Sequence, residues 1–175
     1  LIFVVDEVQT GVGRTGTFLC YEQFGVKPDV VSLAKGIGGG LPLGAVMMND
    51  KTADVLGFGQ HGSTFGGNPV ACAGANYVLD QVMKPEFLEE VKRKSSYMKE
   101  KLLAMEQIES VTGLGLMLGA KLVDGLTAGE VAGRCVEEGL LVLTAKTKLR
   151  FLPPLTIGYD EIDRGMEILA RVLQG

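Results

Sequence analysis

Two charged residues, Asp6 and Lys35, each follow an apolar segment that is typical of a buried strand. Asp6 follows the segment LIFVV, and Lys35 ends the segment DVVSLAK. Open α/β sheets bind their ligands at the carboxyl ends of parallel strands, so we expect both side chains at one edge of a sheet. Burying an unpaired carboxylate is costly or forces it to take up a proton. Asp6 is therefore expected to face a group that needs a fixed negative charge.

Lys35 carries a primary amine that can act as a nucleophile. It follows Leu33 and Ala34 and precedes Gly36, so we expect its stem in apolar surroundings and its amine partly desolvated. A desolvated lysine amine is nucleophilic, as imine chemistry requires. An imine-forming lysine and a carboxylate that can pair with a ring nitrogen are the two groups that pyridoxal phosphate requires of its protein. Spacing alone leaves the alternative that Asp6 and Lys35 form an ordinary ion pair at the rim of a loop.

The segment GVGRTG, residues 11–16, matches the glycine pattern of dinucleotide-binding loops. Three features argue against that function. Asp6 and Glu7 stand between the strand and the glycines, where they would repel a pyrophosphate. Gly25 and Pro28 prevent a long helix from following. The acidic residue expected at the end of the next strand is missing, because Asp29 begins that strand.

The composition excludes several classes of protein. The 175 residues are 46% hydrophobic, enough to bury the core of one or two domains. The net charge of -4 argues against nucleic acid and anionic membranes as partners. No apolar run reaches the roughly 18 residues that a membrane span needs. Three scattered cysteines, Cys20, Cys72 and Cys135, indicate reduced thiols in a cytosolic protein, and none has neighbours that suggest a metal site.

Residues 1–84 have the pattern of an α/β unit. Three strands are predicted, and the first is a central parallel strand that is apolar on both faces. A short helical segment and one helix are also predicted. Asn68 caps this helix, and Pro69 occupies its first position. The strands cover 1–5, 29–35 and 41–49, the helical segment covers 17–25, and the helix runs from 69 to about 83.

Residues 85–175 have the pattern of a linking helix and a small α+β domain. The amphipathic helix begins at Pro85, Thr127 and Glu130 form a capping box, and Asp160 is predicted to cap the last helix. A strand pair or bent strand is predicted over 111–122, a helix from 127 to about 139, short strands over 140–144 and 149–153, and the final helix to about 173. No flexible linker separates the two parts. Because the chain begins inside a predicted strand and without Met, we expect it to be a piece of a longer polypeptide.

Three segments, taken in order, carry a resemblance to a known family. DEVQTGVGRTG, PDVVSLAKGIGGGLPLGAV and HGSTFGGNPVACA closely resemble the class III pyridoxal-phosphate aminotransferases. HGSTFGGNP together with LRFLPPL looks most like the acetylornithine branch of that family. The resemblance covers essentially the whole chain and implies pyridoxal-phosphate fold type I, with part of the large-domain sheet followed by the small carboxyl-terminal domain.

The resemblance also implies roles for individual residues around the cofactor. Lys35 would hold pyridoxal phosphate as an imine and later move a proton, and Asp6 would pair with the pyridine nitrogen. Val8 would pack on a face of the ring, and Gln9 would donate a hydrogen bond to its phenolic oxygen. A core valine and a solvated amide are the structural alternatives for these two residues.

Further residues are placed by the same resemblance. Thr64 would reach the cofactor phosphate of the neighbouring subunit of a homodimer, with Ser63 as a weaker phosphate ligand. Arg150 would clamp the substrate α-carboxylate through two parallel donors. His61, the only histidine, receives no role from the motif, and Arg14 could bind an anion or brace its loop.

The expected activity is transfer of the terminal amine of N-acetylornithine to 2-oxoglutarate by a cytoplasmic homodimer, with an amino acid and a 2-oxo acid as small-molecule partners. Ornithine, succinylornithine and 4-aminobutyrate aminotransferases are alternatives within the family. A different alternative is that these 175 residues alone form a catalytically inactive structural or dimerising piece.

Overall fold

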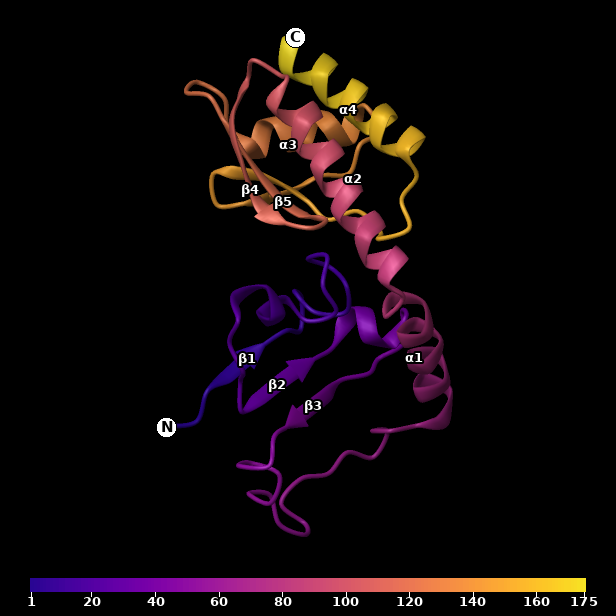
Figure 1. The fold of residues 1–175 in the computed structure, drawn as a ribbon. Helices are drawn as coiled ribbons and strands as arrows, with labels where there is room; N and C mark the ends of the chain where they lie inside the picture. The colour runs from indigo at the N-terminus through magenta and orange to yellow at the C-terminus, as the bar shows by residue number, and fades with distance from the viewer. The chain divides into compact units, whose positions relative to one another are not determined.

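The computed structural model describes all 175 residues, which form two compact units, Leu1–Glu89 and Glu90–Gly175 (Figure 1). Each unit has its own sheet. The first sheet has three strands, and the second has four. None of the helices combines the length and the apolar character that crossing a membrane requires.

The sheet of the first unit contains β1 (Val4–Asp6), β2 (Val30–Leu33) and β3 (Ala45–Met48), in that order (Figure 1). β1 and β2 are parallel, with Asp6 opposite Ser32, which confirms the parallel relation predicted for the first two strands. β3 instead runs antiparallel to β2, with Ser32 opposite Val46. The connection between β2 and β3 is too short for the helical crossover that a parallel strand needs, so the chain returns directly.

Within these 175 residues, the first strand differs in two respects from the central, fully buried strand predicted over residues 1–5. Regular pairing begins only at Val4, and β1 lies at an edge because β2 is its only neighbour in the chain. Leu1, Ile2 and Phe3 are consequently exposed.

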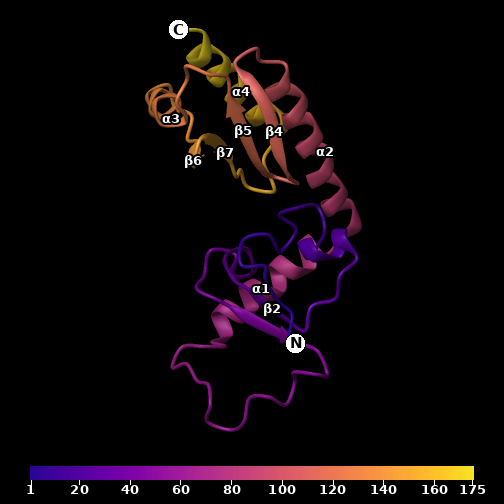
Figure 2. The ribbon, with the colours of Figure 1, turned by 90° about the vertical axis from the view of Figure 1, so that its left-hand side faces the viewer.

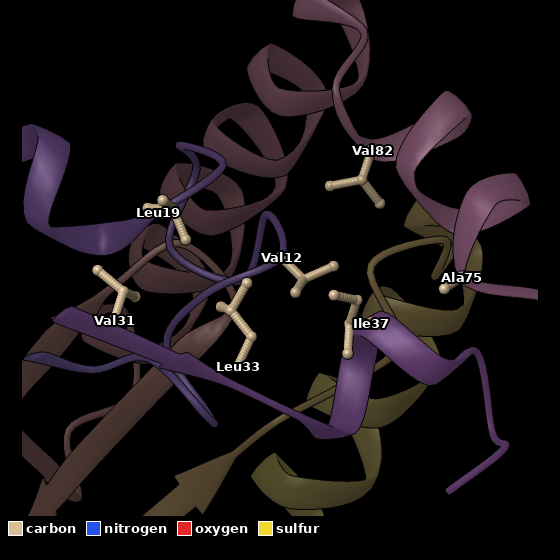
Figure 3. Packing of buried hydrophobic residues seen from close by; sticks show 7 residues of the cluster. All are labelled: Val12, Leu19, Val31, Leu33, Ile37, Ala75 and Val82. Carbon is tan, nitrogen blue, oxygen red and sulfur yellow. The ribbon is translucent and has the colours of Figure 1, made fainter. Parts of the chain in front are cut away.

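The core of the first unit lies between β2, the turns that follow β1 and β2, and helix α1 (Pro69–Val82). Figure 3 shows seven of its side chains directed toward one another: Val12, Leu19, Val31, Leu33, Ile37, Ala75 and Val82. The predicted cap of α1 is confirmed, since the Asn68 side chain accepts a hydrogen bond from the Ala71 N–H at 2.9 Å. Gly39 is required where α1 meets the turn after β2, because its φ is +59° and a Cβ there would lie 2.9 Å from Val78 Cγ2.

The second unit packs helices on a four-stranded antiparallel sheet, β4-β5-β7-β6 (Figure 2). The large apolar side chains that are fully buried in it include Val91, Leu102, Leu118, Leu149 and Leu169. Its first element is α2 (Pro85–Leu103), whose first turn still belongs to the first unit. The elements that follow are β4 (Ile108–Leu114), β5 (Met117–Leu122), α3 (Ala128–Glu137), β6 (Leu143–Ala145), β7 (Lys148–Phe151) and α4 (Tyr159–Gln174).

The capping predictions for the second unit have mixed outcomes. The N-cap part of the box predicted for α3 is confirmed, because Thr127 Oγ1 accepts from the Glu130 N–H at 3.4 Å. The reciprocal bond to the Thr127 backbone is not formed, since Glu130 Oε2 accepts from Thr127 Oγ1 instead, at 2.6 Å. The cap predicted for α4 is wrong: Gly158, not Asp160, is the N-cap, and its N–H donates to Glu161 Oε2 at 2.8 Å. Asp160 lies in the first turn of the helix, where its negative charge suits the helix dipole.

Candidate active site

Asp6 ends β1 with its carboxylate held by two donors on the same oxygen. Oδ1 accepts from the Val8 N–H at 2.9 Å and from Ser32 Oγ at 3.2 Å. These two bonds orient the carboxylate and leave Oδ2 able to accept from a further donor. The side chain is exposed. Asp6 is therefore not the buried carboxylate of this segment.

Glu7 is the buried carboxylate instead, and its burial was missed in the sequence. It is 1% exposed, and it lies on the opposite face of the strand because successive side chains alternate. Glu7 Oε1 accepts from the Tyr21 N–H at 2.8 Å, and Oε2 accepts from Thr10 Oγ1 at 2.5 Å. A carboxylate followed three residues later by a threonine is the only sequence signal that indicates this arrangement.

Lys35 begins the short 3₁₀ helix η2 (Lys35–Gly38), directly after the extended residue Ala34. Its φ is +50°, a left-handed conformation that is rare for a lysine and is found where the surrounding structure enforces it. Leu33 and Ile37 on either side are buried, whereas Lys35 itself is exposed. The expected apolar surroundings of its amine are therefore wrong for this chain, since the left-handed turn directs Lys35 away from the core that its neighbours enter.

The structure brings Asp6 and Lys35 to the same end of two adjacent parallel strands. Asp6 is opposite Ser32 in β2, and Lys35 follows Ser32 by three residues, after the extended residue Ala34. The two side chains do not form an ion pair with each other. The arrangement thus differs from the ion-pair alternative, and each charged group is available to a ligand at this end of the sheet.

Val8 and Gln9 lie in the turn that follows this end of β1, and both are half-buried. The turn is closed by a hydrogen bond from the Gly11 N–H to the Glu7 carbonyl at 3.0 Å. Glycine is required at position 11, because a Cβ there would lie 2.9 Å from the Glu7 carbonyl oxygen. Arg14 follows in the next turn, where burial lowers the pKa of its guanidinium below the ordinary range.

Ser63 and Thr64 lie in the irregular segment between β3 and α1, and both are exposed. Because β3 is antiparallel to β2, this segment begins at the sheet end opposite to Asp6 and Lys35, as Figure 1 shows. Thr64 makes no hydrogen bond with Asp6 or Lys35. His61 lies in the same exposed segment.

Arg150 belongs to the second unit, in the middle of β7 between Gly119 of β5 and Leu143 of β6. Its neighbour Leu149 is fully buried, so Arg150 lies on the opposite face of the strand and is half-buried. Arg150 lines a cavity of about 410 Å³ between β6, β7 and α4. The other lining residues are mostly apolar, with Glu161 as the second charged group.

No cluster of three or more histidine, cysteine, aspartate or glutamate side chains is arranged to hold a metal ion. The functional groups that the fold gathers are thus a carboxylate and an amine in the first unit and a guanidinium in the second. None of these sets is typical of a metal site.

A model of the class-III aminotransferase family matches residues 1–173, nearly the whole chain. The chain therefore belongs to the class-III aminotransferases. It is 50% identical over 173 residues to the acetylornithine aminotransferase of Haemophilus ducreyi, covering 99% of this chain and 44% of the relative. The corresponding enzyme of Caldanaerobacter subterraneus is 45% identical over 178 residues, covering 99% and 45%.

Solved structures give the same result for the fold. The N-acetylornithine aminotransferase of Stenotrophomonas maltophilia superposes with a TM-score of 0.88 at 34% identity, covering 99% of this chain and 47% of that one. An ornithine aminotransferase from Plasmodium yoelii superposes with a TM-score of 0.88 at 32% identity, covering 99% and 48%. The fold is the α/β fold of this family, and the chain spans less than half the length of these relatives.

Proposed function

We propose that the full-length protein containing this chain is a pyridoxal-phosphate-dependent aminotransferase that moves the terminal amine of N-acetylornithine to 2-oxoglutarate, a reaction of arginine biosynthesis. The observation that carries the proposal is the placement of Asp6 and Lys35 at the same end of the parallel pair β1 and β2. The acetylornithine aminotransferases among the relatives support the choice of amino donor.

The donor set fits the cofactor. Asp6 has an oriented carboxylate whose Oδ2 can accept from a protonated ring nitrogen, and Lys35 has an exposed amine in no ion pair. When bound, pyridoxal phosphate supplies an electron-accepting ring that stabilises the negative charge left on a carbon after its proton departs. Asp6 would hold the proton on the ring nitrogen, which keeps the ring electron-poor.

Lys35 has two proposed tasks. Its Nζ would attach the cofactor covalently, and once the substrate amine has displaced it, the same nitrogen would carry a proton over a short distance as a general acid and base. Val8 would pack against the ring, and Gln9 would donate a hydrogen bond to the phenolic oxygen. Both lie in the turn that follows Asp6 directly.

Thr64 supports a homodimeric assembly in this proposal, with Ser63 as a weaker phosphate ligand. The segment that carries them leaves the sheet at the end opposite to Asp6 and Lys35. A phosphate contact by Thr64 would therefore be made to the cofactor of a neighbouring subunit. Gly62, Gly66 and Gly67 leave the backbone of this segment open to such an approach.

Arg150 would clamp the α-carboxylate of both the amino acid and 2-oxoglutarate. Its place beside an apolar cavity suits this task, because a charge-assisted bond is stronger where water is partly excluded. In this proposal residues 1–84 are the carboxyl-terminal part of the large cofactor-binding domain, and residues 85–175 are the linking helix and the small domain. The three free cysteines support a cytoplasmic location.

The ornithine aminotransferases among the solved structures favour ornithine as the second candidate donor. One experiment separates the candidates. The purified full-length protein is loaded with pyridoxal phosphate, its visible absorption is recorded, and turnover with 2-oxoglutarate is compared for N-acetylornithine, ornithine, succinylornithine and 4-aminobutyrate. We expect a visible band and the highest kcat/KM for N-acetylornithine. Absence of the band would overturn the cofactor, and a preference for ornithine would replace the proposed donor.

A further inference from the structure

The Glu7 side chain joins two segments that are separate in the sequence. One carboxylate oxygen accepts from the Tyr21 N–H in η1 (Cys20–Phe24), and the other accepts from Thr10 Oγ1 in the turn after β1. The side chain is 1% exposed, so water cannot replace either bond. Removing the carboxylate would leave the Tyr21 N–H without its acceptor, which is costly in a buried site.

The backbone of Glu7 holds the same turn from its other side. Its N–H donates to Ser32 O at 2.9 Å, which extends the ladder between β1 and β2 by one residue. Its carbonyl accepts from the Gly11 N–H at 3.0 Å, which closes the turn that contains Val8, Gln9 and Thr10. Glu7 thus bonds to Thr10 and Gly11, the two residues that end the turn after Asp6.

We propose that Glu7 is a positioning residue whose buried carboxylate sets where the turn presents Val8 and Gln9 relative to Asp6. The inference rests on the proposed function, because Val8 and Gln9 matter only if a cofactor lies against them. Asp6 is oriented by Ser32 as well as by the Val8 N–H, so it keeps one donor if the turn moves. Glu7 therefore acts on the ring contacts more than on the Asp6 carboxylate.

Three variants separate positioning from plain stability. Glu7→Met keeps the volume but removes both acceptors. Glu7→Gln can keep both bonds, because its amide oxygen accepts from the Tyr21 N–H and the Thr10 hydroxyl can accept from its amide nitrogen. Thr10→Val removes one bond only. Thr52→Val is the control, because Thr52 is fully buried and bonded to the Asp29 carbonyl at 2.9 Å, remote in sequence from the turn.

The first measurement needs no cofactor. Amide hydrogen exchange is followed residue by residue in the full-length protein without pyridoxal phosphate. In Glu7→Met we expect faster exchange at Tyr21, whose N–H loses its partner, and also at Val8, whose N–H is bonded to Asp6 and not to Glu7. Faster exchange at Tyr21 with an unchanged rate at Val8 would show that Glu7 does not hold the turn.

The second measurement uses the cofactor spectrum. Loss of one hydrogen bond to the phenolic oxygen is expected to move the pH midpoint of the visible band by roughly 0.5–1 unit in Glu7→Met and to weaken cofactor binding about tenfold. Thr10→Val should have a smaller effect in the same direction, and Glu7→Gln should restore values near the wild type. Thr52→Val should lower the unfolding temperature without moving the midpoint.

The outcomes distinguish this inference from the proposed function. If the wild type shows the band and Glu7→Met and Thr10→Val keep its midpoint, Glu7 is only structural, while the proposed function stands. If the wild type shows no band after addition of pyridoxal phosphate, both are overturned. Should Glu7→Met fail to fold, Thr10→Val decides by the exchange rate at Val8 and by the midpoint of the visible band, because it leaves the Tyr21 bond in place.

Discussion

Ser32 donates a hydrogen bond from Oγ to Asp6 Oδ1 at 3.2 Å, across the parallel pair in which these two residues are register partners. The Val8 N–H donates to the same oxygen at 2.9 Å. One donor thus comes from the neighbouring strand and the other from the turn that follows. Together they orient the carboxylate through Oδ1, so Ser32 should affect any chemistry that depends on the direction of Asp6.

Ser32→Ala is expected to slow the chemical step of the full-length enzyme roughly three- to tenfold, because a solvent-exposed hydrogen bond to the Asp6 carboxylate, worth about 1 kcal/mol, is lost while the Val8 donor remains. Covalent attachment of the cofactor should persist. Single-turnover rates with N-acetylornithine provide the measurement, and Ser95→Ala, at a buried serine of the second unit, is the matched control. An unchanged rate would show that Val8 alone orients Asp6.

Asp6→Asn should slow the same step much more than Ser32→Ala. The amide keeps the size of the side chain but is neutral, so it cannot hold a proton on a ring nitrogen. The cofactor should still attach to Lys35. Comparison of the visible spectrum with the single-turnover rate tests this directly, and a wild-type rate in Asp6→Asn would limit Asp6 to a structural role.

Lys35→Ala should abolish turnover while the fold is retained, because one nitrogen provides both the covalent attachment and the proton transfer. The measurement is mass spectrometry of the peptide labelled after borohydride reduction of the loaded enzyme. Lys27→Ala, at an exposed lysine of the same unit, should keep the label. A label that persists on another lysine of Lys35→Ala would transfer the assignment to that residue.

The positions of Asp6 and Lys35 could be predicted because each follows an apolar strand pattern, and the carboxyl ends of neighbouring parallel strands meet at one edge of an open α/β sheet. The direction of β3 could not be predicted from the sequence. It depends on the tight return between the strands, where Gly39 and Gly40 take φ values of +59° and +99°. A glycine-rich segment indicates that such a turn is possible but does not specify its direction.

The burial of Glu7 and the exposure of Asp6 could not be predicted either, because the core covers only one face of β1. Adjacent acidic residues at a strand end must face opposite sides, and the sequence does not say which side the core occupies. Similarly, Asp160 and Glu161 both suit the first turn of a helix, and only the bond from Gly158 N–H to Glu161 Oε2 shows where α4 begins. For Glu7 a contact with the distant residue Tyr21 decides between two local choices, and for α4 a local capping bond decides.

A pH effect on stability is expected from Asp163 on α4. Hydrogen bonds from the Tyr97 hydroxyl at 2.7 Å and from Lys101 at 2.9 Å hold the pKa of the Asp163 carboxyl below its usual range. A lowered pKa in the folded state contributes stability above the ordinary pKa near 4 and loses it as the pH falls through the lowered value. Asp163→Asn should therefore lower the unfolding temperature at pH 7, and the difference from wild type should shrink on acidification. Glu167→Gln, at an exposed residue of the same helix, is the control. If the unfolding temperatures of Asp163→Asn and wild type differed equally at pH 7 and pH 3, the expectation would be contradicted.

Arg150→Lys should damage catalysis with the amino acid and with 2-oxoglutarate alike, because both half-reactions would seat an α-carboxylate against the same side chain. Lysine keeps the charge but lacks the planar pair of donors, so the substrate loses orientation more than attraction. A charge-assisted hydrogen bond is worth roughly 1.5–3 kcal/mol, which corresponds to a fall in kcat/KM on the order of ten- to a hundredfold.

Paired kinetics for the two substrates, measured with the cofactor Kd, test the Arg150 assignment. Arg171→Lys is the matched control, since Arg171 is an exposed arginine of the same unit whose contact with Glu138 is long, at 3.8 Å. Cofactor affinity should remain at the wild-type value in both variants, because Arg150 is assigned to the substrate carboxylate and not to the ring or phosphate. A loss confined to one substrate, or to cofactor affinity, would show that Arg150 is not the shared carboxylate clamp.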